Sequence, residues 1–453
     1  MKENKKTIIF AGVAIGLALM AFIFSPTKIT PDAFLDQGES FFPDFTDPNS
    51  ATTLEVIEYD ENSGSPYAFK VTFTNGKWSI PSHHNYPADG KDRLANTAAG
   101  VIDITKDDYR TNNVSDYEML GVIDPMDETA SLEGRGKRVT FKGEGGMSLA
   151  DIIIGHEVEG RPNMRYVRLP DEKRVYATRM NIDISTRFED WIKADLLEIV
   201  NTDIEKVIIN DYSINERTRS VDRRDNIQLS VRDSIWTAKG MKSSQIIDTT
   251  VMNGFVSTLD ELTIVGIRPK PKGLSATLKQ IEGQGEISQS DRRSLQSKGF
   301  FFTNDGQLMS NEGELQVLSS KGVFYTLRFG EVVYGSGLAV TAGTEEGSNS
   351  QSGGSAQNRY LFISTEFNQS KFPEPPKPTN TEFLKKADSL FTESDRSNKA
   401  VYSIHNKWQR DVDRGMQLSR NLNDRFAEWY YVISADSFDK LHLSRNELIV
   451  SKN

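Results

Sequence analysis

The pattern of apolar and polar positions begins with an unbroken apolar run over residues 8–24 (IIFAGVAIGLALMAFIF), and no run of this length recurs downstream. A helix of seventeen residues is about 26 Å long, close to the roughly 30 Å of a bilayer's hydrocarbon core. Three lysines precede the run, and no small-x-small cleavage site follows it. We therefore expect residues 1–25 to form a cytoplasmic tip and an uncleaved transmembrane anchor. The alternative is a removed signal peptide.

The charges that flank this run predict its orientation. Lysines lie before it and acidic residues follow it, which places the N-terminus in the cytoplasm and the bulk of the chain outside the cytoplasmic (inner) membrane. Gly12 and Gly16 form a GxxxG spacing within the run, so one helix face is small enough for close contact with another helix. This spacing is also common by chance in apolar helices. Gly12 and Gly16 are the only candidate site residues, as a helix-packing face.

Residues 26–50 are rich in proline, aspartate and phenylalanine and predict an extended juxtamembrane linker. We expect its aromatic side chains to dock on the first folded domain. These are Phe34, Phe41, Phe42 and Phe45.

After the linker the apolar pattern occurs twice, 158 residues apart. Alternating apolar positions lead into a two-residue turn and a tryptophan, first at Asn75-Gly76 before Trp78, then at Asp233-Ser234 before Trp236. A helical spacing follows each hairpin at the same offset, in Leu94, Ala98 and Val101 and in Met252, Val256 and Leu259. An RF-acid-W segment closes the first copy (187–191) and is echoed at 425–429.

This duplication predicts an α+β fold with two similar modules of mostly antiparallel sheet, each packed by a helix. The first module covers residues 51–200 and the second 201–368, with a Gly/Ser-rich loop at 335–358. Residues 369–453 then form a Pro-rich linker, a charged helical insertion from about 381 to 424, and a closing strand pair at 430–433 and 441–450.

Composition excludes several classes of function. The chain has no cysteine, so disulfides, thiolate catalysis and zinc–thiolate or iron–sulfur sites are ruled out. A formal net charge of −10 argues against nucleic acid as a partner, because phosphate binding needs a clustered positive surface. We expect no cofactor.

Motifs for catalysis are not apparent in the sequence. The five histidines show no metal-binding spacing, and the adjacent pair His83-His84 is interpreted as an exposed loop. There is no GxSxG nucleophile elbow. The glycines at 134–136 and 283–285 do not form a phosphate loop, and acidic pairs such as Asp107-Asp108 say nothing about acid–base chemistry without geometry.

The tryptophans allow two interpretations. Recurrence of Trp78 and Trp236, and of Trp191 and Trp429, at matching places favours core packing. A carbohydrate-binding platform is the alternative, and it requires exposed tryptophan or tyrosine on one face.

Several short segments together resemble the bacterial family known as domain of unknown function 4340. They include Trp78-Ser79-Ile80-Pro81, Tyr86-Pro87-Ala88-Asp89, Tyr117–Pro125, Ile152–Gly155 and Arg165–Val167. The likeness covers residues 30–200 well and the second module more loosely, and the segment 425–434 is similar to planctomycete-type members. The family has no established activity or catalytic residues. Its members often accompany ABC-type transport components, including ones similar to gliding-motility proteins, which implies an accessory role.

Two functions follow as hypotheses. The first is a non-enzymatic single-pass membrane protein, anchored in the bilayer through residues 8–24, that serves as an accessory or scaffold subunit beside ABC-type transport components. The second is an extracytoplasmic module that binds glycan or a cell-envelope polymer. An envelope hydrolase would need two carboxylates about 5–10 Å apart in a cleft, and no such pair stands out in the sequence.

Overall fold

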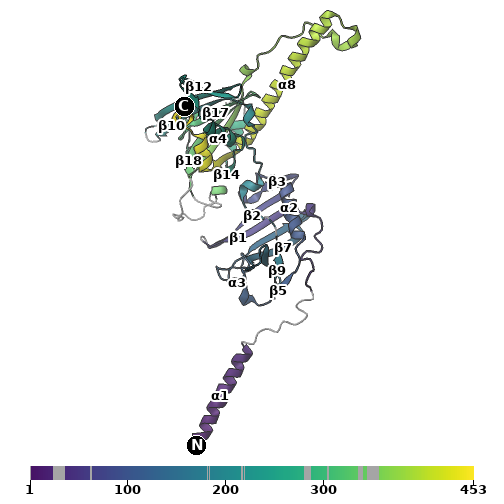
Figure 1. Cartoon of the computed structure of the whole chain (residues 1–453), viewed down its shortest axis with the longest axis vertical. Helices are drawn as coiled ribbons and strands as arrows, with labels where there is room; N and C mark the ends of the chain where they lie inside the picture. Colours follow the sequence, from purple (N-terminus) through teal and green to yellow (C-terminus); the bar gives the residue numbers. More distant parts are fainter. Residues whose placement is uncertain are drawn as a thin grey trace. The chain divides into compact units, whose positions relative to one another are not determined.

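The computed structural model in Figure 1 describes most of the chain as helices, strands and ordered connections. The described residues are 2–23, 36–61, 64–180, 182, 184–215, 218, 220–279, 287–303, 306–334, 340–343 and 357–452, without the side chains of 2–9, 21–23 and 279.

The chain divides into two compact units. The first comprises Met1–Ala68 and Leu94–Asp183, and the second comprises Phe69–Arg93 and Ile184–Asn453. The second unit therefore takes in residues 69–93, which the sequence pattern assigns to the first module.

The first sheet has nine strands in the order β4-β3-β2-β1-β6-β7-β8-β9-β5. Their bounds are β1 Thr53–Asp60, β2 Ser65–Thr74, β3 Lys77–Ile80, β4 Tyr86–Pro87, β5 Asp108–Thr111, β6 Lys137–Lys142, β7 Ser148–Glu157, β8 Met164–Arg168 and β9 Val175–Arg179. The pairings from β1 through β6, β7, β8 and β9 to β5 are antiparallel. Helices α2 (Lys91–Ile102) and α3 (Tyr117–Leu120) lie between these strands in the chain.

The second sheet has eight strands in the order β12-β11-β10-β17-β18-β19-β20-β14. Their bounds are β10 Ile204–Asn215, β11 Ser220–Arg232, β12 Ile235–Ala238, β14 Ile264–Pro269, β17 Glu314–Ser319, β18 Val323–Val333, β19 Asn358–Phe367 and β20 Trp429–Ile433. Two small pairs accompany it, β13 (Gln245–Ile247) with β21 (Ile449–Ser451), and β15 (Phe300–Phe302) with β16 (Leu308–Ser310). The helices of this part are α4 Thr249–Asp260, α5 Lys272–Lys279, α6 Gln289–Gln296, α8 Glu393–Ala427, α9 Ala435–Leu441 and α10 Arg445–Leu448.

Eight strands have the same order in both sheets. Read across the sheet, the first sheet contains the strands β3-β2-β1-β6-β7-β8-β9-β5 and the second β12-β11-β10-β17-β18-β19-β20-β14. Strands at the same position in the two lists also have the same rank along the chain within their set of eight. In each, a helix follows the hairpin and leads to the strand at the far edge of the sheet. The fold is mixed α+β with large antiparallel sheets, as predicted.

Both predicted hairpin turns have left-handed backbone at their two central residues. The φ angles are +54° at Asn75 and +75° at Gly76, and +49° at Asp233 and +63° at Ser234. Two successive left-handed residues give the type I′ twist that suits a two-residue hairpin, so asparagine, aspartate and glycine are favoured there. Of the four turn residues, only Ser234 is of a type that does not favour this conformation.

The predicted apolar faces of the two post-hairpin helices are buried. Leu94, Ala98 and Val101 of α2 are at most 1% exposed. In α4 the buried residues are Met252, Phe255, Val256 and Leu259, and Asp248 caps the helix by accepting from the backbone N–H of Thr250 and Val251. The linker aromatics Phe41 and Phe45 are buried in the first unit, whereas Phe34 lies outside the described residues.

Three details differ from the sequence-based expectation. The stretch 441–450 is not one strand, because Ser434 and Ser444 cap two short helices, α9 and α10, and only β21 is extended. The long helix begins at Glu393, after a Thr392 capping box, and not near residue 381. The echo at 425–429 runs from the end of α8 into the first residue of β20, whereas Arg187–Trp191 follows β9, so these segments occupy different places in the strand order.

Helix α8 packs its C-terminal half on β18 and β19 through a glycine. At Gly415 an added Cβ would lie 2.4 Å from the Lys321 carbonyl oxygen and 2.4 Å from a ring carbon of Phe367. We expect Gly415→Ala to lower the free energy of unfolding by about 2 kcal/mol, because helix and sheet must separate to admit the methyl group.

Chemical denaturation of the full chain measures this effect. Gly254→Ala in α4 is the matched control, because nothing lies within 4 Å of the added methyl group. We expect that change to be neutral or to stabilise by up to about 1 kcal/mol. Equal effects of the two substitutions would show that close approach at Gly415 is not needed.

The N-terminal apolar run lies in helix α1 (Lys2–Ile23), and Phe24 lies outside the described residues. Among the helices of the described residues, none is both long enough and apolar enough to cross a membrane.

Candidate functional site

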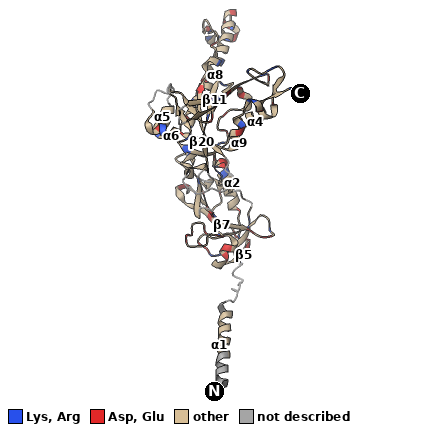
Figure 2. Cartoon of the chain, turned by 90° about the vertical axis from the view of Figure 1, so that its left-hand side faces the viewer, with Lys and Arg blue, Asp and Glu red and all other residues tan. Residues whose placement is uncertain are grey.

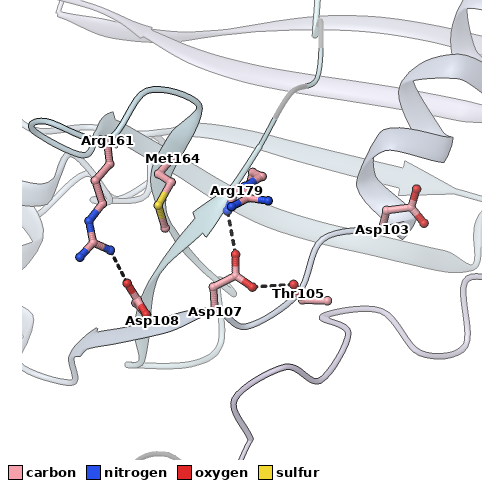
Figure 3. A pocket seen from close by; sticks show the side chains of 7 residues that line it. All are labelled: Asp103, Thr105, Asp107, Asp108, Arg161, Met164 and Arg179. Atoms are coloured by element: carbon pink, nitrogen blue, oxygen red, sulfur yellow. Dashed lines mark hydrogen bonds and ion pairs between the residues drawn. The ribbon is translucent and has the colours of Figure 1, made fainter.

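A polar hollow of about 510 Å³ lies in the first unit, where β5, β8 and β9 meet the chain that follows α2. Figure 3 shows the side chains that line it, namely Asp103, Thr105, Asp107, Asp108, Arg161, Met164 and Arg179. Three carboxylates and two guanidinium groups thus surround one small space. The acidic pair Asp107-Asp108, noted in the sequence, is part of it.

Asp107 links the chain before β5 to strand β9 at the wall of the hollow. Its carboxylate accepts hydrogen bonds from the hydroxyl of Thr105 (2.7 Å), the hydroxyl of Thr178 (3.2 Å) and the backbone N–H of Arg179 (3.0 Å). The side chains of Asp107, which directly precedes β5, and Asp108, its first residue, point to different partners in Figure 3. Asp108 pairs instead with Arg161 at 2.5 Å.

Two charged groups at the hollow have no hydrogen-bond or ion-pair partner among the described residues. Asp103 is exposed and its side chain forms no hydrogen bond or ion pair with the described residues. The guanidinium of Arg179 is likewise without a partner among them, since only the backbone of Arg179 bonds to Asp107. The arrangement suits a small polar molecule that carries both charges, and the side chains that line it include no serine or histidine to act as a nucleophile.

We expect Asp107→Ala to lower the free energy of unfolding by about 2 kcal/mol, because the Thr105 hydroxyl and the Arg179 backbone N–H lose their acceptor at once. Asp103→Ala is the control on the same hollow and should change stability by less than about 0.5 kcal/mol. Thermal and urea denaturation measure both variants. A loss at Asp103 as large as that at Asp107 would contradict this division of roles.

The pair His83-His84 is only partly exposed: His84 is exposed, as expected, whereas His83 is buried, contrary to expectation. His83 is 1% exposed and stacks on Phe188, with ring centroids 4.6 Å apart. Its ring nitrogens lie 3.1 Å from the hydroxyl of Ser82 and 2.9 Å from that of Thr341. His84 Nε2 lies 2.6 Å from the carbonyl oxygen of Ala342.

The two histidines therefore hold a described segment of the Gly/Ser-rich loop, residues 340–343, in the second unit. Arg268 of β14 donates to the carbonyl of Val340 at 2.9 Å. Glycine at 266 gives the segment room, since a Cβ there would lie 2.2 Å from the Val340 carbonyl oxygen. Burial, together with the positive charges of His84 and Arg268, lowers the pKa of His83 to about 4. At pH 7 the His83 side chain is therefore neutral, and it holds this segment in place through its hydrogen bond with Thr341.

The remaining histidines each have different surroundings. His156 is exposed, His405 lies 3.3 Å from Glu374, and His442 stacks on Phe438. Within the described residues, no three side chains of histidine, aspartate or glutamate lie close enough to hold a metal ion.

Other positions singled out from the sequence have structural roles or cannot be placed. Around the turn at 134–138, Arg135 donates to the carbonyls of Ser131, Asp124, Pro125 and Ala130, and Arg138 pairs with Asp151 and Asp124. Gly12 and Gly16 lie in α1 with no other atom within 4 Å of an added Cβ. The glycines at 283–285 lie outside the described residues.

All five tryptophans belong to the described residues, and none of their side chains is exposed. Trp191 and Trp429 are buried at 0% and 8%, while Trp78, Trp236 and Trp408 are half-buried. The ring of Tyr86 lies edge-on to Trp429, with centroids 5.0 Å apart, and edge-on to Phe188 at 5.5 Å. Phe188 belongs to the same short helix as Trp191.

One buried cation is not predicted by the sequence pattern. Lys270 is 5% exposed, its ammonium donates to the carbonyl of Phe426 at 2.7 Å, and it lies 3.9 Å from the Phe362 ring centre. Burial lowers its pKa well below the ordinary lysine value. It caps the C-terminal end of α8, where cations are favoured. A lone lysine between two prolines gives no sequence signal for such a role.

Comparison with known families gives one result. Residues 78–277 match the family model described as domain of unknown function, DUF4340. The match begins at β3 and ends within α5, so it spans the last strands of the first sheet and the first strands of the second. No curated protein and no solved structure matches the chain.

Proposed function

We propose that this chain, which carries a DUF4340 domain over residues 78–277, is a non-enzymatic single-pass membrane protein. In this proposal its two duplicated α+β modules lie outside the cytoplasmic membrane and serve as an accessory or scaffold subunit of an ABC-type transport complex. The shared strand order of the two sheets supports the duplication.

The observation that carries the membrane part is the uncovered apolar surface of α1. Six large apolar side chains of this helix are each more than half exposed, from 54% at Val13 and Met20 to 73% at Phe10. The others are Ile15, Leu17 and Leu19. Apolar area costs free energy in water, about 25 cal/mol per Å², and a lipid or protein environment removes that cost. The lysines at the start of the helix, ahead of its apolar run, favour an N-terminus in the cytoplasm.

The alternative of a glycan or envelope-polymer binding module has less support. Its aromatic platform needs exposed tryptophan or tyrosine on one face. The five tryptophans are buried or half-buried, and Tyr334, at 68%, is the one exposed tyrosine among the described residues. The hollow at Asp103 and Arg179 suits a small charged molecule better than a neutral sugar.

Anchoring is tested first, by washing native membranes with alkaline carbonate. The full chain should remain in the pellet, and a chain that begins at residue 27 should be released. Release of the full chain would overturn the membrane part of the proposal.

Partnership is tested by purifying the full chain from its native membranes in mild detergent. Transport subunits should accompany the wild type and be lost from the Gly12→Leu, Gly16→Leu variant, because leucine fills the small helix face. Recovery of the chain alone, or with envelope polymer, would overturn the accessory role.

A further inference from the structure

Among the described residues, the N-terminal half of helix α8 is covered on one side only, the side that faces segment 372–391. Contacts follow this segment along the helix. Phe372 accepts from the indole N–H of Trp408 at 3.0 Å, and Asn398 accepts from the backbone N–H of Thr379 at 2.8 Å. Further along, Asp395 pairs with Lys386 (2.8 Å) and Lys399 with Asp388 (3.1 Å).

The opposite side of this half is open and carries unpaired cations. Four exposed basic side chains there form no hydrogen bond or ion pair with the described part of the chain, namely Arg396, Lys407, Arg410 and Arg414. Their spacings of eleven, three and four residues keep them on one face at 3.6 residues per turn. Figure 2 colours the charged positions along α8.

The open face also holds an apolar centre and two carboxylates. Ile404 is 59% exposed, and the small Ala400 lies one turn before it on the same face. Glu393 and Asp411 belong to this face as well, and neither side chain has a partner among the described residues. The carboxylates would repel a membrane or a polyanion from this face, so the row of cations does not fit a broad anionic surface.

The charged residues along the open face are placed so that they match those of a second α8 in antiparallel orientation. If a second α8 lies antiparallel with its centre near Ile404, Glu393 of one copy comes within about one turn (5.4 Å along the axis) of Arg414 of the other. Arg396 likewise comes within about one turn of Asp411. Twofold symmetry makes each pair twice, while Lys407 lies opposite Ala400 and not opposite another cation.

The open face also has the spacing of a two-helix seam. Successive positions along it alternate between three and four residues apart, as in helices that pack side by side along their length. These positions are Ser397, Ala400, Ile404, Lys407, Asp411 and Arg414.

We propose that the open face of α8, residues 393–414, binds α8 of a second copy of this chain in antiparallel orientation. One pair of helices buries less than a standard protein–protein interface, so the dimer is weak and depends on concentration. The proposal does not depend on the transport role or on the membrane anchor.

Cysteine crosslinking tests the proposal directly, because the chain has no cysteine of its own. Full-length Ile404→Cys in detergent should form a disulfide-linked dimer on mild oxidation. Asp413→Cys is the matched control, since it is exposed on the same helix but points away from the open face. The Gly12→Leu, Gly16→Leu background removes dimerisation through α1. Equal crosslinking of the two variants, or none with Ile404→Cys, overturns the proposal.

Charge reversal tests the pairing. In the Ile404→Cys background, Arg414→Glu should reduce the crosslinking rate about five- to tenfold, because two pairs become repulsive in each dimer. Adding Glu393→Arg should restore it, and Arg420→Glu on another side of the helix should have no effect. Failure of the double reversal to restore crosslinking overturns the antiparallel pairing. If Arg414→Glu abolishes capture of an acidic protein and leaves crosslinking unchanged, the face binds that partner and the proposal is wrong.

Discussion

Trp191→Ala is expected to lower the free energy of unfolding of the second unit by about 4 kcal/mol, the largest effect of any single substitution considered. The indole is fully buried and lies 5.9 Å from the Phe69 ring, and Arg93 lies over it at 5.5 Å. Its N–H donates to the carbonyl of Ser185 at 2.9 Å. Truncation therefore leaves a cavity and an unpaired carbonyl together, and large-to-small aromatic changes cost about 3–5 kcal/mol.

Urea denaturation followed by circular dichroism measures this change. Trp236→Ala is the control, since Trp236 lies in the second of the two repeated hairpins but is only half-buried. Its loss should cost about 1 kcal/mol. Equal losses of stability in the two variants would contradict the expectation that the fully buried Trp191 contributes more to stability than the half-buried Trp236.

The second large effect is a loss of stability between pH 6.5 and pH 4 that depends on His83. The pKa of His83 is lowered to about 4 in the folded chain, while an unfolded histidine takes up a proton near pH 6.5. Below pH 6.5 the unfolded state binds more protons than the folded state, so stability falls as the pH falls toward 4. A shift of this size corresponds to about 3 kcal/mol, of which none is lost above pH 7.

Carboxylates also titrate in this range, so the measurement is a difference. His83→Gln should be less stable than the wild type at pH 7, because stacking on Phe188 is weakened, and its stability should fall by about 3 kcal/mol less on acidification. His156→Gln, at an exposed position, should follow the wild-type curve. Parallel pH profiles for wild type and His83→Gln would show that His83 does not supply the pH dependence.

Short-range patterns predict the repeated elements well. The hairpin turns at Asn75-Gly76 and Asp233-Ser234 and the buried faces of α2 and α4 follow from local spacing alone, because a strand or helix buries one side at a fixed period. The apolar residues of the closing segment 441–450 predict a strand there, and that prediction is wrong except at its end, where β21 begins at Ile449. Ser444 and Glu447 instead form a capping box that starts the short helix α10.

The candidate sites are harder to predict because they depend on residues distant in sequence. Asp107 stands out in the sequence only as half of an acidic pair, and its partners Thr178 and Arg179 lie about 70 residues away. The sequence around His83 predicts an exposed loop, because nothing near it in the chain shows that Phe188 and Thr341 would enclose it. A single sequence does not show which distant residues come into contact. The alignment of the cations on one face of α8, by contrast, follows from the spacing of its own residues.

The division of the chain has a consequence for the order in which it folds during synthesis. All residues of the first unit have been made once Asp183 is added, whereas residues 69–93 must wait for the remaining 270 residues of their unit, 184–453. At about 5–20 residues per second this delay lasts roughly 15–50 s. During that time Phe69, Val71 and Ile80, which are at most 2% exposed in the finished protein, have no completed core to enter. The hydrophobic hairpin of β2 and β3 therefore leaves the ribosome before its unit is complete, and depletion of a holding chaperone should reduce the yield of this chain.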